Sequence, residues 1–418
     1  MIIGIIGLGD MGKLYAKNFA KAGYEVIGCD LPEKTEELSR ELADHGVLVI
    51  NDSIAVSRTA DFIIYSVEAE KIAAVVAHSA HATKYGAIVA GQTSVKHPEI
   101  AAFEKYLPAD VNIVTCHSLH GPGFPTEGQQ LIVIKHRATD KAYRMAMDVF
   151  AALGSNITEI LDYHVHDKIV ADTQAVTHMG FESMGTAWKN AGFYPWDSDS
   201  YNHGGIDNVK ILTTLRIFSY KAHVYAGLAI FNPYARQQVK SYAQSESELF
   251  KLMIMEEEAQ FRERIYKARE FVFHKGRKFL LLDDSVMNSF RLSDMSFNKK
   301  PNSHLSLLSM VDAWSSLQVN PYENLICETP PFRLRLGIAE YLFKNDEMLE
   351  EAINTALFDK SIRGDDLEFH SAVREWASII GHGDLQGYKN QFEDTKRFFA
   401  HRLDESLELS SEMISRLE

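Results

Sequence analysis

Short apolar runs alternate with amphipathic stretches through residues 1–162. Runs rich in Ile, Val and other strand-forming residues occur at 2–6, 25–29, 48–50, 62–67, 87–90, 112–116 and 131–135. Segments with helical spacing separate them, at residues 13–22, 33–45, 72–79, 98–106 and 141–152. Strands that alternate with helices indicate a mainly parallel sheet with helices on both faces. We therefore expect an α/β N-terminal domain built on a doubly wound sheet.

Beyond this region the pattern changes to long helical segments. We expect helices at 166–190, 209–229 and 235–273, one short strand at 279–282, and loops at 195–205 and 295–303. The segment 246–270 is rich in Glu, Gln and Arg, which suits either a solvated face or a dimer surface. The expected organisation is an α/β domain at 1–162, a helical domain at 163–290 and a helical C-terminal extension at 291–418.

The composition is that of a globular protein with a large core, because 46% of the residues are hydrophobic and 24% are charged. The net charge of 43 − 57 = −14 argues against nucleic acid or an anionic membrane as the main partner. The cysteines Cys29, Cys116 and Cys327 are too few for a disulfide framework and suit a reducing cytoplasm. No apolar run reaches the ~18–20 residues of a membrane span. We expect a cytoplasmic protein without a membrane segment.

The first expected strand is joined to the first expected helix by the glycine-rich sequence Gly7-Leu8-Gly9-Asp10-Met11-Gly12. In such a loop Gly7 permits the tight turn, Gly9 lets the backbone approach a pyrophosphate, and Gly12 allows close packing of helix on strand. The N–H groups at the start of the helix are free to bind phosphate oxygens. The order of strand, glycines and helix predicts a Rossmann-type dinucleotide site, to which we assign all six residues.

Asp30 and Ser66 are expected to extend this cofactor site. Asp30 ends the second strand, where an acid binds the adenosine ribose hydroxyls, and Ser66 lies at the end of the fourth strand. A carboxylate repels the 2′-phosphate of NADP, so Asp30 alone weakly favours NAD. Lys34 is the only cation close to it in sequence, and it suits either a 2′-phosphate contact or an ordinary helix surface.

Polar loops follow two neighbouring strands at the sheet edge where ligands bind. Ser94 lies after the fifth strand, and His117 comes directly after the sixth. Oxidation of an alcohol by NAD(P)⁺ needs a base for the hydroxyl proton, and histidine suits this role near neutral pH. We expect His117 to be that base. Ser94 is expected either to orient the substrate or the histidine, or to cap a helix. His120 is expected to be either a turn residue or a second polar contact.

Two polar residues of the helical region are candidates for the substrate pocket. Gln174 and His178 lie four residues apart in an expected helix, so both project from one face. They either complete a polar substrate pocket or are buried, hydrogen-bonded groups between helices.

Four of these motifs, in this order, resemble the prephenate/arogenate dehydrogenase family of tyrosine biosynthesis. The similar segments are Ile5–Gly12, Gln92–Lys96, His117–Pro122 and Gln174–His178. In the family, the serine that matches Ser94 contacts the substrate and the catalytic histidine, and the histidine that matches His117 takes the hydroxyl proton. Other segments are similar to the long fungal-type members, so that the likeness covers nearly the whole chain: His164–Lys168, Tyr194–Trp196, His223–Leu228, Leu281–Asp284 and Pro301–Leu307.

The resemblance implies an enzyme that converts prephenate to 4-hydroxyphenylpyruvate by oxidative decarboxylation, with hydride transfer to NADP⁺ or NAD⁺. It implies NADP as the cofactor, since fungal-type members are described as NADP-dependent. It also implies a helical domain of the 6-phosphogluconate dehydrogenase type, a homodimer, prephenate as the small-molecule partner and no metal.

Two departures from the family pattern affect the site. Ser118 stands where the family has a proline after the catalytic histidine. Bacterial members also place an arginine for a substrate carboxylate near the end of a second-domain helix, and residues 227–233 contain none. Lys221 or Arg216, further up the same helix, is then expected to hold the side-chain carboxylate of the substrate.

Two other functions compete with this interpretation. A 3-hydroxyacid or 6-phosphogluconate-type dehydrogenase has a similar glycine loop but would use a catalytic lysine, for which Lys168 is the available residue. A non-catalytic sensor would bind NAD(P) and signal through the C-terminal region. The histidine-bearing loop at His117 favours the first interpretation over both.

Overall fold

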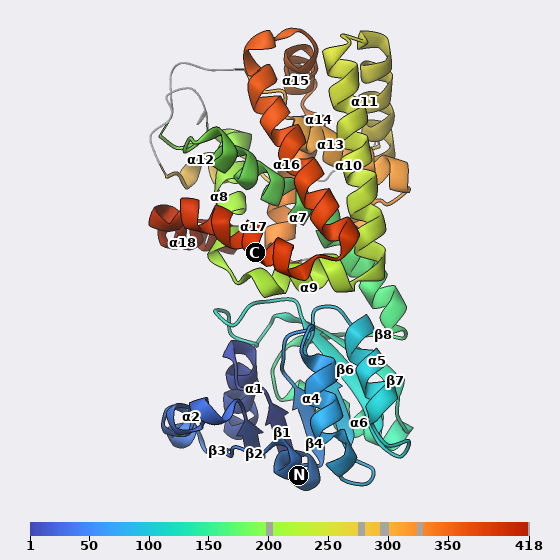
Figure 1. The fold of residues 1–418 in the computed structure, drawn as a ribbon, viewed down its shortest axis with the longest axis vertical. Coiled ribbons are helices and arrows are strands. Elements are labelled where there is room, and N and C mark those ends of the chain that lie inside the picture. Colours follow the sequence, from blue (N-terminus) through green and yellow to red (C-terminus); the bar gives the residue numbers. More distant parts are fainter. Residues whose placement is uncertain (198–203, 275–280, 293–300, 324–328, 417–418) are drawn as a thin grey trace. The chain divides into compact units, whose positions relative to one another are not determined.

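The computed structural model describes residues 1–197, 204–274, 281–292, 301–323 and 329–416. The chain forms two compact units, Met1–Lys168 and Ile169–Glu418, and each is described by itself (Figure 1). The three domain ranges expected from the sequence stay predictions. Residues 279–280 of the strand expected at 279–282 lie outside the described residues, and Leu281 and Leu282 are described but form no strand. Much of the two expected loops and Cys327 also lie outside the described residues.

The first unit contains an eight-stranded sheet in the order β3-β2-β1-β4-β5-β6-β7-β8. All neighbouring strands are parallel except β6 and β7, which are antiparallel. The strands are β1 (Ile2–Ile6), β2 (Glu25–Cys29), β3 (Val47–Val49), β4 (Phe62–Tyr65), β5 (Ile88–Gly91), β6 (Asn112–Ser118), β7 (Gln130–Arg137) and β8 (Asn156–Ile160). The mainly parallel, doubly wound sheet predicted from the sequence is confirmed.

Helices cover both faces of this sheet: α1 (Asp10–Lys21), α2 (Thr35–Leu42), α3 (Ser53–Thr59), α4 (Ile72–Ser79), α5 (His97–Tyr106) and α6 (Asp140–Ala151). Successive strand residues point to opposite faces, so each strand supplies two cores. In β1, Ile3 and Ile5 join the cluster beneath α1 and α6, whereas Ile6 joins the cluster beneath α3, α4 and α5. A strand buried on both faces reads as a continuous apolar run, which is why the strands were recognisable in the sequence.

The second unit is helical, and α7 (Tyr163–Ala191) leads into it (Figure 1, green to red). Its other helices are α8 (Gly205–Ser219), α9 (Ala222–Phe231), α10 (Pro233–Ile254), α11 (Glu258–Val272), α12 (Asp284–Ser289), α13 (Leu305–Leu317), α14 (Pro330–Lys344), α15 (Asp346–Phe358), α16 (Arg363–His382), α17 (Leu385–Phe398) and α18 (Leu403–Ser415). The prediction of a mostly helical C-terminal region is confirmed.

One hydrophobic cluster runs through the whole helical unit, from Val176 to Ile414. Helix α10 packs against α13 and α16, α18 packs against α8, and α17 packs against α9. Trp314 and Trp376 are fully buried, and the Trp376 indole N–H donates to the Thr186 hydroxyl at 3.0 Å. Residues of the last third of the chain are therefore part of the same core as α7.

Two long helices expected from the sequence are each broken in the structure. The helix expected at 209–229 is divided at Tyr220–Lys221, where Lys221 has an extended backbone before α9. The helix expected at 235–273 is divided after Ile254, and Glu256 has a left-handed backbone with φ of 54°. Neither break carries the Gly or Pro that marks a helix end. The spacing of apolar residues in the sequence therefore predicted one continuous helix across each break.

Two elements were missed, and two strands, β6 and β7, are longer than expected. The edge strand β8 has mostly half-exposed or exposed residues, and α3 is a short helix capped by Asp52, which accepts the Ile54 N–H at 2.8 Å. Strand β6 continues through His117 and Ser118 because these residues pair with Ile132 and Leu131 of β7. His117 thus lies within a strand, and the expectation that it follows the strand was wrong.

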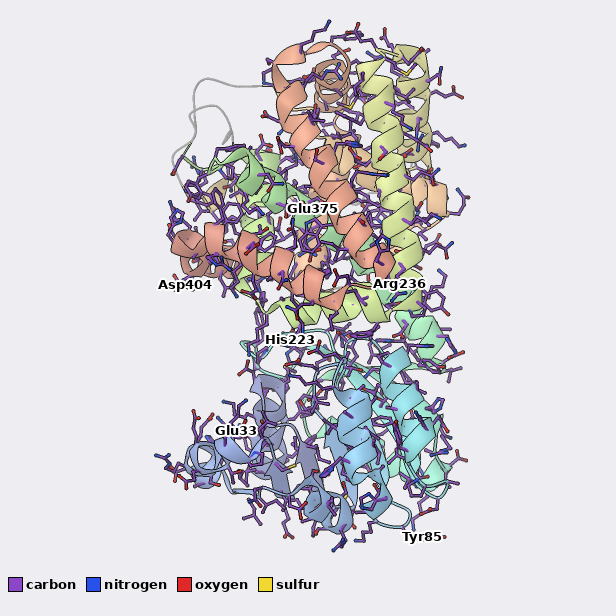
Figure 2. All side chains as sticks on the ribbon, in the orientation of Figure 1. Glu33, Tyr85, His223, Arg236, Glu375 and Asp404 are labelled. Carbon is purple, nitrogen blue, oxygen red and sulfur yellow. The ribbon has the colours of Figure 1, made fainter. Side chains whose placement is uncertain are left out.

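The acidic character of the chain is spread over the surface of both units. The charged side chains Glu33, Glu375 and Asp404 are all exposed (Figure 2). Among the described residues, no helix combines the length and apolarity needed to cross a membrane.

Candidate active site

The glycine loop between β1 and α1 is shaped by contacts that exclude side chains. Gly7 has φ of +100°, and a Cβ on it would lie 2.3 Å from the Ser66 carbonyl oxygen. A Cβ on Gly12 would lie 2.0 Å from the Gly7 carbonyl oxygen. Nothing lies within 4 Å of a Cβ placed on Gly9. Gly7 and Gly12 are therefore required for packing, and Gly9 leaves open space beside the first turn of α1, which fits the pyrophosphate of a dinucleotide.

Asp30 at the end of β2 is bound to the backbone of this loop. One carboxylate oxygen accepts the Leu8 N–H at 2.7 Å, and the other accepts the Leu31 N–H at 2.8 Å. The Lys34 ammonium lies 3.7 Å from the same carboxylate and is half exposed. These donors compensate the negative charge of Asp30, so its repulsion of a 2′-phosphate is weaker than the sequence suggested.

His117 is 6% exposed and is the first member of a hydrogen-bonded series. Its Nδ1 lies 2.9 Å from Nε2 of His166, and Nδ1 of His166 lies 2.8 Å from the Asp167 carboxylate. Burial, with smaller contributions from His166 and Lys96, holds the pKa of His117 well below the usual value for histidine. The imidazole is therefore neutral near pH 7 and able to accept a proton.

Lys96 supports the end of β6 rather than the substrate. Its ammonium is fully buried, lies 3.0 Å from the Glu99 carboxylate, and donates to the carbonyl oxygens of Gly91 and Cys116. The buried ion pair and its backbone acceptors lock the ends of β5 and β6 together. The backbone beside His117 is held in place by this network.

Ser118 replaces the expected proline and makes a contact that a proline lacks. Its hydroxyl lies 2.6 Å from the Tyr15 hydroxyl on α1, so it ties the histidine-bearing strand to the nucleotide-binding helix. Burial holds the pKa of Tyr15 well above the usual value for tyrosine. The pair therefore remains a neutral hydrogen bond at physiological pH.

Ser94 and His120 lie in the loops beside this series. Ser94 is half buried after β5, and among the described residues no hydrogen bond joins it to His117. It does not cap α5, which begins at His97 after Lys96. His120 is half buried, and its Nδ1 lies 3.0 Å from the Gly121 carbonyl oxygen. A substrate-orienting role for Ser94 stays a prediction.

The second unit presents a polar face of α7. Gln174, His178 and Glu182 line a pocket together with Tyr225 of α9 and Tyr388 of α17. The ring of His178 meets that of Tyr225 edge-on, with centroids 5.0 Å apart. The Tyr388 hydroxyl donates to the Glu182 carboxylate at 2.5 Å, and burial raises the pKa of Glu182 to about 8. The sequence-predicted pair, Gln174 and His178, thus lines one pocket.

The two cations expected from the sequence lie elsewhere in this unit. Arg216 is 3% exposed, and one of its nitrogens donates to the hydroxyls of Ser410 at 3.0 Å and Ser411 at 2.8 Å, both on α18. Lys221 is exposed at the start of α9. Neither residue is among those that line the pocket of Gln174 and His178.

Arg335 on α14 also does not line that pocket, but it is a candidate that sequence reasoning missed. It is 2% exposed, and its guanidinium lies 5.3 Å from the centre of the Phe181 ring. Nε and Nη1 have no hydrogen-bond partner among the described residues. Its charge lowers the pKa of His178, after the larger effect of burial, and offsets part of the rise that burial causes in the pKa of Glu182. The signal in the sequence was an arginine between Leu334 and Leu336 in an apolar helix.

His166 and Asp167 were also missed as members of the site. The sequence showed them only as part of a segment similar to the fungal-type family. Lys168, the lysine available to a different dehydrogenase mechanism, is exposed. Adjacent His and Asp residues at the start of a helix give no sign of burial, so only their contacts with His117 and α5 identify them.

A glycine loop on a doubly wound sheet, a buried neutral histidine at its edge and a polar pocket in a helical unit define a dehydrogenase that uses a nicotinamide cofactor. Two family models match accordingly: the NAD binding domain of 6-phosphogluconate dehydrogenase over residues 2–161, and a 6-phosphogluconate dehydrogenase C-terminal domain over residues 175–418. The chain belongs to the prephenate dehydrogenase family, as its similarity to curated relatives shows.

Two fungal relatives match over nearly their full lengths. Prephenate dehydrogenase [NADP(+)] of Saccharomyces cerevisiae is 48% identical over 424 residues, which cover 100% of this chain and 94% of the relative. Probable prephenate dehydrogenase [NADP(+)] of Schizosaccharomyces pombe is 44% identical over 420 residues, which cover 99% of this chain and 97% of the relative. The family resemblance predicted from the sequence motifs is confirmed.

A solved structure is similar in fold. Prephenate dehydrogenase from A. aeolicus, in complex with hydroxyphenyl propionate and NAD⁺, has a TM-score of 0.52 and 16% sequence identity. The match covers 63% of this chain and 94% of that chain. The remaining part of this chain has no counterpart in that structure, in accord with the expected long form.

Proposed function

We propose that this enzyme catalyses the oxidative decarboxylation of prephenate to 4-hydroxyphenylpyruvate and CO₂, with NADP⁺ as the hydride acceptor. The observation that carries the proposal is the buried, neutral His117 at the edge of the nucleotide-binding sheet, in a chain of this family. The names of both fungal relatives include NADP(+), which supports this choice of cofactor.

The cofactor would be held by the glycine loop, with the pyrophosphate at Gly9 and the start of α1, and the adenosine ribose near Asp30. Leu8, Asp10 and Met11 belong to the same loop, and Ser66 lies against Gly7 and Gly12. When bound, the nicotinamide accepts a hydride from the carbinol carbon of the substrate. Lys34 is the cation available to a 2′-phosphate, since its ammonium is half exposed and only 3.7 Å from Asp30.

His117 would act on the ring hydroxyl of prephenate. Its free ring nitrogen takes the hydroxyl proton as the carbonyl forms. Loss of CO₂ then breaks the C–C bond to the ring carboxylate, and the electron pair makes the ring aromatic. The resulting phenolate oxygen takes the proton back from His117, so the enzyme ends the cycle in its starting protonation state. A largely buried histidine suits this cycle, because no net proton has to leave the site.

Prephenate also carries a side-chain carboxylate, which needs a cation. Arg335 is the better candidate than Arg216, since Arg216 already donates to Ser410 and Ser411 whereas two nitrogens of Arg335 lack partners among the described residues. Gln174 and His178 would supply further hydrogen bonds to the substrate. The ring carboxylate should stay without a tight ion pair, because it must leave as CO₂.

The activity is tested by mixing the purified enzyme with prephenate and either NADP⁺ or NAD⁺, and following the absorbance of the reduced cofactor. We expect reduction of NADP⁺ in preference to NAD⁺ and formation of 4-hydroxyphenylpyruvate, measured by chromatography. Absence of reduction with both cofactors contradicts the proposal. Turnover of a 3-hydroxyacid in place of prephenate would support the alternative dehydrogenase class instead.

The enzyme is further proposed to work in the cytoplasm as a homodimer. The buried, unpaired thiols of Cys29 and Cys116 support a reducing compartment. Exposed apolar side chains on the helical unit, such as Ile254 and Met255, support a subunit interface there. Light scattering coupled to size-exclusion chromatography tests the oligomer, and a monomer mass at micromolar concentration contradicts it.

A further inference from the structure

Three buried side chains form one hydrogen-bonded series behind the proposed base. His117 lies on β6, whereas His166 and Asp167 lie near the start of α7, and the exposed fractions of the three are 6%, 0% and 1%. The ring of His117 meets that of His166 nearly at right angles, with centroids 5.1 Å apart. The series has a direction that follows from the chemistry of its last member.

Asp167 can only accept hydrogen bonds while it is ionised. One carboxylate oxygen accepts the backbone N–H of Lys96 at 2.8 Å, and the other accepts the backbone N–H of His97 at 2.8 Å. These amides form the start of α5, where the helix dipole favours a negative charge. Both carboxylate oxygens therefore act as acceptors, so Nδ1 of His166, 2.8 Å from one of them, must carry the hydrogen that joins them.

This hydrogen determines the protonation of both imidazoles. A neutral His166 with a hydrogen on Nδ1 has a bare Nε2, which can only accept. Nδ1 of His117 lies 2.9 Å from that nitrogen, so it must be the donor. The remaining nitrogen of His117, Nε2, is then left with its lone pair free. Burial lowers the pKa of both histidines, which keeps both imidazoles neutral before a substrate binds.

We propose that His166 and Asp167 are positioning residues that hold His117 in the tautomer with a free Nε2 and stabilise its imidazolium during turnover. The inference rests on the proposed function, since it assigns the tautomer of the proposed base. Without Asp167, nothing in the series distinguishes the two tautomers of His166, and one of them blocks the lone pair that takes the proton. The Asp167 carboxylate also offsets the positive charge that His117 gains, through the polarised His166 ring.

The substitution Asp167→Asn tests the series directly. The Asp167 oxygen that faces Nδ1 of His166 also accepts the Lys96 N–H, and the other oxygen accepts the His97 N–H, so an asparagine can offer its oxygen to only one of these amides. With its oxygen on the His97 N–H, its NH₂ group faces Nδ1 of His166 and reverses the direction of both hydrogen bonds. His117 then carries its hydrogen on Nε2, facing the substrate. We expect kcat to fall by ~10²–10⁴-fold, the range of general-base contributions, while the KM for prephenate and the Kd for NADP⁺ change less than about threefold.

The pH profile separates this role from a merely structural one. Removing the carboxylate removes the charge that favours the imidazolium, so the acidic limb of kcat against pH should move to lower pH as the plateau falls. Asp384→Asn is the matched control, because it changes another carboxylate that caps a helix, α17, in the other unit. Neither the plateau nor the limb should move in this control.

If Asp167→Asn does not bind NADP⁺, His166→Gln takes its place, since it keeps the Asp167 carboxylate on the α5 amides. The criteria remain a fall in kcat of at least about tenfold and a shifted acidic limb. A plateau within threefold of the wild type, or an unmoved limb, overturns the inference. Failure of the wild type to reduce NADP⁺ with prephenate would instead contradict the proposed function, so the two results are distinguishable.

Discussion

The ionisable side chains around His117 and the guanidinium of Arg335 differ in how completely they are paired. In the nucleotide-binding unit, His117, His166, Asp167 and Lys96 all make hydrogen bonds within the protein. In the helical unit, the buried guanidinium of Arg335 keeps two nitrogens without partners among the described residues. Glu182 near it has a pKa raised to about 8 by burial. The groups around His117 have their hydrogen-bond partners before the substrate binds, whereas the guanidinium of Arg335 does not have all of its partners.

The difference reflects what each set must do. A base has to be held in one tautomer, and a fully bonded series with a carboxylate at its end achieves this before any ligand arrives. A group that binds an anion has to keep donors free for it, although unpaired buried donors cost stability. Side chains whose hydrogen bonds are all made within the protein therefore indicate groups that transfer the proton. Buried donors without partners among the described residues indicate groups that bind the substrate.

The largest effect is expected from the base itself. His117→Asn should lower kcat by ~10²–10⁴-fold and leave the Kd for NADP⁺ unchanged, because the glycine loop is untouched. Stopped-flow reduction of NADP⁺ and fluorescence titration of the cofactor measure the two quantities. Turnover within about tenfold of the wild type would show that another group accepts the proton.

A smaller effect, on the affinity for the substrate, is expected when the guanidinium of Arg335 is removed. Arg335→Gln should raise the KM for prephenate by about 10- to 100-fold, the equivalent of losing charge-assisted hydrogen bonds worth about 1.5–3 kcal/mol. The melting temperature should not fall, because a buried, incompletely paired charge is removed. Steady-state kinetics and differential scanning calorimetry measure both.

Arg216→Gln is the matched control for that comparison. Its guanidinium is bonded to Ser410 and Ser411 on α18, so the substitution should lower the melting temperature without changing the KM for prephenate. The opposite pattern is a raised KM for Arg216→Gln and an unchanged KM for Arg335→Gln. It would show that Arg216, the residue expected from the sequence, binds the carboxylate.

The raised pKa of Glu182 predicts a pH dependence of stability. The folded state holds the proton up to about pH 8, whereas the unfolded chain releases it near pH 4.5, so unfolding is favoured as pH rises through this interval. The wild type should therefore lose more thermal stability between pH 5 and pH 9 than Glu182→Gln. Glu375→Gln, which changes an exposed side chain, should behave as the wild type does (Figure 2).

The smallest effect is expected at the surface of the nucleotide site. Lys34→Ala should raise the KM for NADP⁺ by about two- to fivefold and leave that for NAD⁺ unchanged, since exposed charge pairs contribute only ~0.2–1 kcal/mol. Equal changes for both cofactors would show that Lys34 does not contact the 2′-phosphate. The ratio of the two KM values is the quantity to compare.

Much of the nucleotide-binding unit could be predicted because its signals are local. Strand β1 and the glycines that follow it are adjacent in sequence, and a buried parallel strand is a continuous apolar run. The helix breaks at Lys221 and Glu256 could not be predicted, because no Gly or Pro marks them.

The residues of the candidate site also divide into those that could be predicted from the sequence and those that could not. His117, Gln174 and His178 could be chosen because their motifs carry both a residue type and a spacing. Arg335 could not, since it is about 150 residues from His178 in the chain and is joined to its surroundings only by tertiary packing. Arg216 was a reasonable choice from its helix alone, but α18 occupies its guanidinium.

By itself the sequence determined the doubly wound sheet, the glycine loop, the family and the histidine that is proposed as the base, because each rests on residues close together in the chain. The tertiary structure decided which charges are paired. It placed the Asp167 carboxylate on the amides of α5 and His166 behind His117, and it left Arg335 buried with nitrogens that have no partner among the described residues. The physical reason is that hydrogen-bond direction and burial depend on partners brought together by packing, which spacing along one chain does not specify.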